Sequence, residues 1–484
     1  MTGKSKTLPA YLTVYLALTL GVMVTLCLAL IEGVRVSTFQ METACIADVC
    51  MDNVMAEYHR ELFRRYNIMA LDSSYGTRRV GRTNLEGRLA WYLDQNMNLG
   101  EKRLPDVVSE YVFRDFLKME LGQAAITDFS LLSDWNGKVF RKQAVEAIKD
   151  DKGVTMAVEA LDWLKTVKDH ELDVRDVEAE KKAIDEQIAA YQREHEGETV
   201  TVVNPTIQIE NAKKWGILWL VLGDKQVSGK KLDQSDLIFR RIGKRENNHG
   251  NMELPEQNYA QKTTEKLLFQ EYLLSYFGNF LDPKEGSALD YEIEYVLIGK
   301  NKDASNLRCV LNRILGIREA ANVEYLYSDT VKRAEAAAVA TLLSSACLVP
   351  ELEELYEAAI ILAWAYAESV YDLRTLMKGG KVPLLKDKNS WHLSVSSLFS
   401  DFFGDEGDAG GKGLTYADYL RILLLLNEEK GTLGRAMNVV EANVRLTPGN
   451  EAFRMDACYV QIGTKISVHS GFGYHLEIRE DKSY

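Results

Sequence analysis

The sequence contains little proline and little cysteine. Only eight prolines occur in 484 residues, whereas alanine, leucine, glutamate and lysine are abundant. Because proline interrupts helices and these other residues favour them, the composition predicts a helix-rich protein. No CxxC pair occurs, which excludes the usual zinc arrangement and a disulfide framework and predicts free thiols. The six cysteines are Cys27, Cys45, Cys50, Cys309, Cys347 and Cys458.

The chain also lacks an excess of positive charge and the common catalytic motifs. Its formal net charge is −13, which argues against an extended phosphate-binding surface and therefore against nucleic acid as a partner. The sequence has no HExxH, no GxSxG and no glycine-rich nucleotide fingerprint. We therefore expect no catalytic residues, no cofactor and no metal ligands, and a protein that is not an enzyme. The acidic pair Glu292 and Glu294 could serve a glycosidase, but neighbouring acids are common.

One long apolar run stands near the N-terminus. From Thr7 to Ile31 the 25 residues TLPAYLTVYLALTLGVMVTLCLALI include no charged side chain. About 20 apolar residues suffice for a helix to cross a bilayer, and this run is longer than the apolar region of a secretory signal peptide. We expect an uncleaved single-pass anchor, with residues 7–32 in the membrane and residues 1–6 as a cytoplasmic tip.

The charges that flank this run predict its orientation. Lys4 and Lys6 precede it, and among the twenty residues that follow it Arg35 is the only basic one. Since cytoplasmic flanks carry the excess of lysine and arginine, we expect the N-terminus in the cytoplasm and the larger C-terminal part outside it.

Small residues recur at every fourth position of the predicted membrane helix. Such spacing makes a groove through which another helix can approach closely, so we expect a helix-packing face. Small residues are also common in membrane helices that have no such partner, and both readings stay open here. The six residues of this face are Thr13, Ala17, Gly21, Thr25, Ala29 and Gly33.

A helical period continues beyond the membrane. Apolar residues at spacings of three and four predict an amphipathic stalk helix over residues 33–67, continuous with the anchor. On one helix Glu57 and Glu61 lie on one side and His59 about 200° away, so the stretch EYHREL cannot converge on a metal. We expect instead salt bridges of Glu61 with Arg64 or Arg65, and of Glu57 with Arg60.

The remaining chain predicts a predominantly helical α+β ectodomain. Residues 68–137 are expected to be helical, and residues 138–198 to form a charged helical hairpin or short coiled coil. This hairpin is either an arm for a partner or a solvated insertion. Residues 199–484 are expected to form an α+β body, and strict alternation at its end predicts a β-hairpin over 456–480, in a small sheet.

Several long phrases resemble a bacterial family of single-pass membrane proteins. They are LTVYLALTL with LIEGVR, AEYHRELFRRYNIMALDSSYG, LDYEIEYVLIGK, NRILGIREAANVEYL, ILAWAYAESVYDLRTL with KVPLLK, and GLTYADYLRILL. The family looks like the minor pilin or pseudopilin-like components of tight-adherence (Tad/Flp-type) pilus systems in Gram-positive bacteria. The resemblance implies an assembly role and supplies no catalytic residues. Glu32 is the first acid and stands at the far end of the apolar helix, whereas prepilins carry a glutamate near its start.

The sequence thus predicts a non-enzymatic, membrane-anchored, extracytoplasmic structural or assembly component of a Tad-like pilus or secretion apparatus. Its expected partners are the lipid bilayer and other membrane or pilus-assembly proteins, reached through the membrane helix and the charged helical arm. The alternative is a surface-anchored hydrolase or a cell-wall-binding protein.

Overall fold

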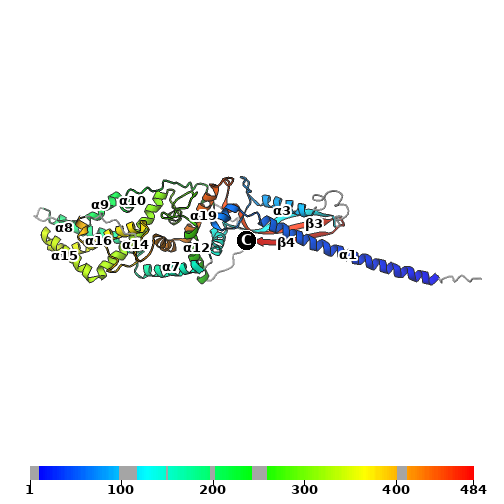
Figure 1. Cartoon of the computed structure of the whole chain (residues 1–484), viewed down its shortest axis with the longest axis horizontal. Coiled ribbons are helices and arrows are strands. Elements are labelled where there is room, and N and C mark those ends of the chain that lie inside the picture. Colours follow the sequence, from blue (N-terminus) through cyan, green and yellow to red (C-terminus); the bar gives the residue numbers. More distant parts are fainter. Residues whose placement is uncertain (1–9, 98–116, 149–150, 197–201, 243–258, 401–410) are drawn as a thin grey trace, which may run out of the picture.

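The computed structural model describes residues 10–97, 117–148, 151–196, 202–242, 259–400 and 411–484. Figure 1 shows an elongated molecule with a long helix projecting at one end, a sheet beside that helix, and a body of packed helices at the other end. The predicted class, α+β and predominantly helical, is confirmed. The expected cytoplasmic tip, residues 1–6, lies outside the described residues.

Helix α1 (Ala10–Met55) has two halves that differ in burial. Its first half is apolar all round and exposed, and it is long and apolar enough to cross a membrane. Its second half carries apolar residues at helical spacing that lie in a core, including Phe39, Ala47, Cys50 and Val54. A segment long and apolar enough to cross a membrane and a core helix are therefore parts of one continuous helix.

The predicted stalk helix over 33–67 is wrong in its last third, because α1 ends at Met55. His59 has an extended backbone, and its Nδ1 accepts a hydrogen bond from the amide of Leu62 at 3.2 Å, which begins the new helix α2 (Arg60–Tyr66). Asn67, with φ of 51°, ends α2 in the left-handed conformation that asparagine tolerates. No glycine or proline marks the break in the sequence, so the helical period alone did not reveal it.

Within the described residues the sheet has four antiparallel strands: β1 (Leu71–Asp72), β2 (Met119–Leu131), β3 (Cys458–Ser470) and β4 (His475–Ser483). The predicted C-terminal hairpin is confirmed as β3 and β4. Strand β2 pairs along one edge of β3, while β4 and then β1 pair along the other.

The expectation that residues 68–137 are helical is correct for α3 (Arg82–Met97) and wrong for β2. The pairing of β2 with β3 shifts register near Leu121, Ile126 and Ser130. Each such bulge interrupts the in-and-out alternation of side chains by which a strand is recognised in a sequence. Gly122, Ala124 and Ala125 also give β2 little β-propensity.

The sheet packs on the second half of α1 and on α3, and these elements share a core of their own. Leu71, Leu85, Leu89, Ile462 and Ile466 are among its fully or almost fully buried side chains. Figure 1 shows β3 and β4 lying alongside α1.

The helical body forms the larger core around α16. Helix α16 is buried on nearly all sides, with Trp364, Tyr356 and Tyr366 almost inaccessible, and it packs against α14 and α15. The body comprises α6 (Asp134–Glu146), α7 (Asp151–Asp169), α8 (Val177–Glu194), α9 (Ile207–Trp215), α10 (Ile217–Leu222), α11 (Ile238–Ile242), α12 (Tyr259–Tyr276), α13 (Glu292–Ile298), α14 (Asp303–Ser328), α15 (Thr330–Cys347), α16 (Glu353–Met377), α17 (Ser397–Ser400), α18 (Tyr416–Leu426) and α19 (Glu429–Arg445), with short 3-10 turns η1 (Pro350–Leu352) and η2 (Met455–Ala457).

The charged segment predicted over 138–198 forms helices, but it does not project as an arm. Helix α7 packs against α12 and α18, whereas α8 packs against α16 and α14. Val167, Leu172, Val177 and Ile188 lie in the core of the body. The sparse apolar residues of this segment therefore pack each helix against the body. The predicted hairpin or coiled coil, in which the two helices would pack mainly on each other, is wrong.

Candidate functional site

The six small residues of the predicted packing face lie along the exposed half of α1, except Gly33, which stands just past the apolar run. Apart from the adjacent backbone of α1 itself, no atom of the described residues would lie within 4 Å of a Cβ added at Gly21 or Gly33. The hydroxyl of Thr25 donates to the carbonyl oxygen of Gly21 at 3.0 Å, so this polar group is satisfied within the helix.

A spacing of four does not keep these residues on one side of a straight helix. Each step of four residues turns about 40° past a full turn, so Thr13 and Gly33 end about 200° apart. Ala17, Gly21 and Thr25 fall within about 80° and form a shared face. Of the six predicted residues, Ala17, Gly21 and Thr25 are therefore the ones that a single partner helix could contact together.

Glu57 of the EYHREL stretch does not pair with Arg60 as expected. Its carboxylate accepts hydrogen bonds from Arg88 at 2.5 Å and from the hydroxyl of Tyr92 at 2.7 Å, both on α3. Burial alone would raise the pKa of Glu57, but hydrogen bonds from Arg88, Tyr92 and Tyr75 lower it below its ordinary value. Glu57 therefore remains ionised and ties the end of α1 to α3.

The other charges of this stretch are also structural. The predicted salt bridge between Glu61 and Arg64 is confirmed at 2.7 Å. Arg65 instead donates to backbone carbonyls, among them that of Asn443 at 3.1 Å. His59 uses both ring nitrogens, because Nδ1 accepts from Leu62 and Nε2 lies 3.0 Å from Oδ1 of Asn450. This histidine therefore caps a helix and has no nitrogen left for a metal or a substrate.

A buried group of ionisable side chains lies inside the helical body. Glu368, Asp372 and His392 each offer one ligand atom, and these atoms lie within 4.8 Å of one another, a spacing that could hold a metal ion. The ammonium of Lys386 already occupies this position, 2.6 Å from Glu368 and 2.7 Å from Asp372. It also donates to the carbonyl oxygen of Ser390 at 2.8 Å.

Arg318 completes this buried charge network. Its guanidinium lies 2.9 Å from Asp372 and donates to the carbonyl oxygens of Pro383 and Leu384 at 2.8 and 2.6 Å. Two acids thus face two bases, all four fully or almost fully buried. The network joins α14 and α16 to the loop that follows α16, and its charges balance without an added ion.

The electrostatics of Glu368 match this structural role. Burial would raise its pKa, but the hydrogen bond from His392 and the positive charge of Lys386 lower the pKa to about 2. A carboxyl with so low a pKa holds no proton to give to a substrate near neutral pH. We infer that the network stabilises the loop that follows α16.

Glu292 and Glu294, the pair weighed for a glycosidase, are both buried in α13. Glu292 accepts a hydrogen bond from the amide of Gly278 at 2.7 Å, and Glu294 accepts one from the hydroxyl of Tyr416 at 2.6 Å. Burial raises the pKa of Glu294 to about 7. Both carboxyls hold neighbouring segments together, in a place that a polysaccharide cannot reach.

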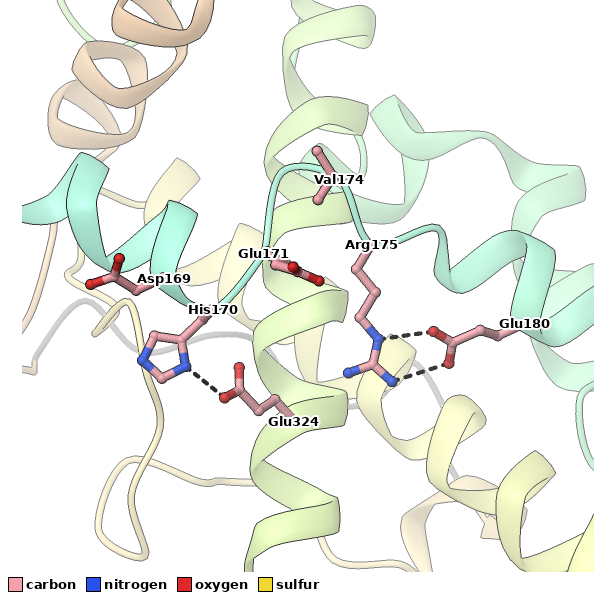
Figure 2. A pocket seen from close by; sticks show the side chains of 7 residues that line it. All are labelled: Asp169, His170, Glu171, Val174, Arg175, Glu180 and Glu324. Atoms are coloured by element: carbon pink, nitrogen blue, oxygen red, sulfur yellow. Dashed lines mark hydrogen bonds and ion pairs between the residues drawn. The ribbon is translucent and has the colours of Figure 1, made fainter.

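Figure 2 shows an open polar hollow where the segment linking α7 and α8 crosses α14. Nδ1 of His170 lies 2.6 Å from Glu324, and Arg175 forms two hydrogen bonds with Glu180. Acids outnumber bases among the lining residues, which are Asp169, His170, Glu171, Val174, Arg175, Glu180 and Glu324. Each basic side chain is paired with an acid, so the hollow offers a ligand little beyond exposed carboxylates.

Sequence reasoning missed the buried network. Glu368 and Asp372 stand four residues apart in the middle of an otherwise apolar core helix, a pattern that requires buried positive partners. The pattern did not identify Lys386 and Arg318 as those partners, because Lys386 lies in the loop after α16 and Arg318 on α14, and spacing within one helix does not show which residues outside it pack against it.

Comparison with known proteins places the chain in a family. No curated protein and no solved structure matches the sequence. Residues 194–470, more than half of the chain, match a family of unknown function, DUF5702. The matched region runs from the end of α8 through the helical body to the end of β3. The chain belongs to the DUF5702 family.

Proposed function

We propose that the protein is a membrane-anchored, extracytoplasmic structural component that assembles with other membrane proteins. The observation that carries this proposal is that the two halves of α1 have different surroundings. Its first half is exposed and apolar, while its second half is part of the core shared with the sheet and α3. A force or a movement applied to the membrane helix therefore reaches the sheet through one continuous helix.

The contacts between α1 and the sheet support a fixed attachment of this kind. Lys482 of β4 forms ion pairs with Asp48 at 2.6 Å and with Asp52 at 2.9 Å, and the hydroxyl of Tyr484 donates to the carbonyl oxygen of Met55. These contacts add to the apolar core between the same elements. The ectodomain is thus held to its anchor by a packed interface.

The pairing of the charged side chains with one another supports a structural role rather than a catalytic one. The charged clusters described above pair internally, and their carboxylates hold helices and loops together. A first helix that is half membrane-spanning and half packed in the ectodomain is also the plan of pilin-like proteins. We therefore include a Tad-like pilus or secretion apparatus in the proposal, with the N-terminus in the cytoplasm.

Association through the membrane helix is tested by Gly21→Leu, which fills the centre of the face formed by Ala17, Gly21 and Thr25. The matched control is Thr19→Leu, about 200° away from Gly21 on the same helix. Full-length variants are cross-linked in native membranes and purified with their bound proteins. We expect Gly21→Leu to lose its cross-linked partners and Thr19→Leu to retain them.

Three results would contradict the proposal. The first is equal recovery of partners by both variants, and the second is the absence of cross-linked membrane partners for the native chain. The third is turnover of wall glycan or peptide by the purified protein, which would favour the surface-anchored hydrolase.

A further inference from the structure

The turn between β3 and β4 lies beside the point where the apolar run of α1 ends. The hydroxyl of Tyr474 donates to the carboxylate of Glu32, the first charged residue after that run. The guanidinium carbon of Arg35 lies 4.3 Å from the ring centroid of Phe472. The rings of Phe39 and Tyr474 are 6.0 Å apart, which fixes the turn against α1.

The lengths of the two elements show that β4 follows α1 away from this point. Eight residues of strand separate Tyr474 from Lys482, a rise of about 26 Å. Lys482 pairs with Asp48 and Asp52, which stand 16 and 20 residues beyond Glu32, a rise of about 24 to 30 Å along a helix. The two rises agree, so the sheet ends at the level of Glu32.

The end of the sheet carries a large apolar side chain that the core does not use. Phe472 is 45% exposed, although most of the apolar side chains of the sheet are buried. It stands between Gly471 and Gly473 in the turn. Next to it, the amide of Gly471 donates to the carbonyl oxygen of Lys118 at 2.8 Å, and the side chain of Lys118 is exposed. We call Lys118 and Phe472 the interfacial tip.

We propose that the interfacial tip enters the headgroup region of the bilayer that α1 crosses. The proposal rests on the anchoring role of α1 given above. An aromatic ring flanked by a lysine suits this region, because the ring reaches the acyl boundary while the ammonium meets lipid phosphates. With the tip as a second point of contact, the sheet stands directly on the membrane and its tilt relative to the bilayer is restricted.

The test uses depth-dependent fluorescence quenching in the full-length protein. Cys27→Ala, Cys45→Ser and Cys309→Ser leave Cys50, Cys347 and Cys458, which are buried. One fluorophore is then attached through Phe472→Cys, Leu20→Cys or Leu342→Cys. The protein is reconstituted into vesicles of phosphatidylcholine and phosphatidylglycerol that contain lipids with a nitroxide near the headgroup or deep in the acyl chain.

We expect the label at Phe472→Cys to lose intensity mainly with the headgroup nitroxide, and the label at Leu20→Cys mainly with the deep nitroxide. Leu342 is 70% exposed on α15, at the opposite end of the molecule, and should not be quenched. If the labels at Phe472→Cys and Leu342→Cys are quenched equally little while the label at Leu20→Cys is quenched, the interfacial tip does not enter the bilayer. That result would contradict this proposal and leave the membrane anchor intact. An unquenched label at Leu20→Cys would overturn the anchor and the tip together.

A second pair of variants carries the label at a neighbouring position, so that the effect of Phe472 itself can be measured. His475→Cys places the fluorophore on an exposed position just past the turn. Adding Phe472→Asp to this labelled chain should reduce its quenching by the headgroup nitroxide, because a carboxylate is expelled from the interface. Unchanged quenching would show that the ring does not enter the bilayer and would contradict the proposal.

Discussion

The ammonium group of Lys386 lies 2.6 Å from a carboxylate oxygen of Glu368, and both side chains are completely inaccessible to solvent. Asp372, at 2.7 Å, is the second acid bound by the same ammonium. The lysine thus holds the position that a cation would otherwise take between these acids. The stability of the helical body depends on this arrangement in ways that can be measured.

Lys386→Met should destabilise the protein strongly. The substitution leaves the two acids buried beside Arg318 alone, and breaking a buried ion pair by removing one partner costs about 3 to 5 kcal/mol. Lys388→Met, two residues away and exposed, is the matched control and should change stability by less than about 0.5 kcal/mol. Urea unfolding of the two variants measures the difference, and equal midpoints would show that the network contributes little.

Acid should weaken the fold through Glu368. Its pKa is lowered from the ordinary 4.5 to about 2, so its contribution is fully present above pH 4.5 and is lost as the pH falls towards 2. The shift corresponds to a contribution on the order of 3 kcal/mol. In Glu368→Gln the free energy of unfolding should be lower at neutral pH and should fall less steeply below pH 4.5. Parallel curves for the two proteins would contradict this assignment.

Glu294→Gln should have the opposite effect at alkaline pH. Burial raises the pKa of Glu294 from 4.5 to about 7, so the native protein loses stability as the pH rises from 4.5 through 7. The glutamine cannot ionise, and its oxygen can still accept from Tyr416. We expect near-native stability at pH 4.5 and a gain of about 3 kcal/mol at pH 8. Thermal unfolding across this range tests the prediction, and a variant that is destabilised equally at both ends would refute it.

Side chains in the core between α1 and the sheet should tolerate truncation far less well than those in the exposed apolar half of α1. Ile466 of β3 is fully buried in this core, whereas Leu20 is exposed. Ile466→Ala should lower the free energy of unfolding by about 2 to 5 kcal/mol, and Leu20→Ala should leave it unchanged. Limited proteolysis of both variants in vesicles measures this. Equal resistance would mean that α1 and the sheet do not form a stable unit.

The sequence predicted those elements whose signal is local. The apolar run of α1 and the alternating strands β3 and β4 each carry their pattern within a few turns or residues. Strand β2 escaped prediction because its bulges shift the alternation near Leu121, Ile126 and Ser130. The break between α1 and α2 escaped it because no glycine or proline marks it, and the side chain of His59 caps the start of α2.

The candidate sites depended on contacts between distant segments, and the sequence could not supply these. Glu57 was expected to pair with a neighbour on its own helix and instead binds Arg88 on α3. Phe472 is about 440 residues from Glu32, yet the turn that contains it lies beside the end of the apolar run. Local spacing predicts which side chains share a helix face, but only the packed fold determines their partners.

The measurement that tests the account most directly uses Cys45, an exposed residue on α1 beyond the apolar run. In a Cys309→Ser background, a membrane-impermeant maleimide is added to intact protoplasts and, separately, to lysed ones. The account predicts full labelling of Cys45 in intact protoplasts, and no labelling in the Cys45→Ser control. Labelling that appears only after lysis would place the second half of α1 and the sheet in the cytoplasm and would contradict the account.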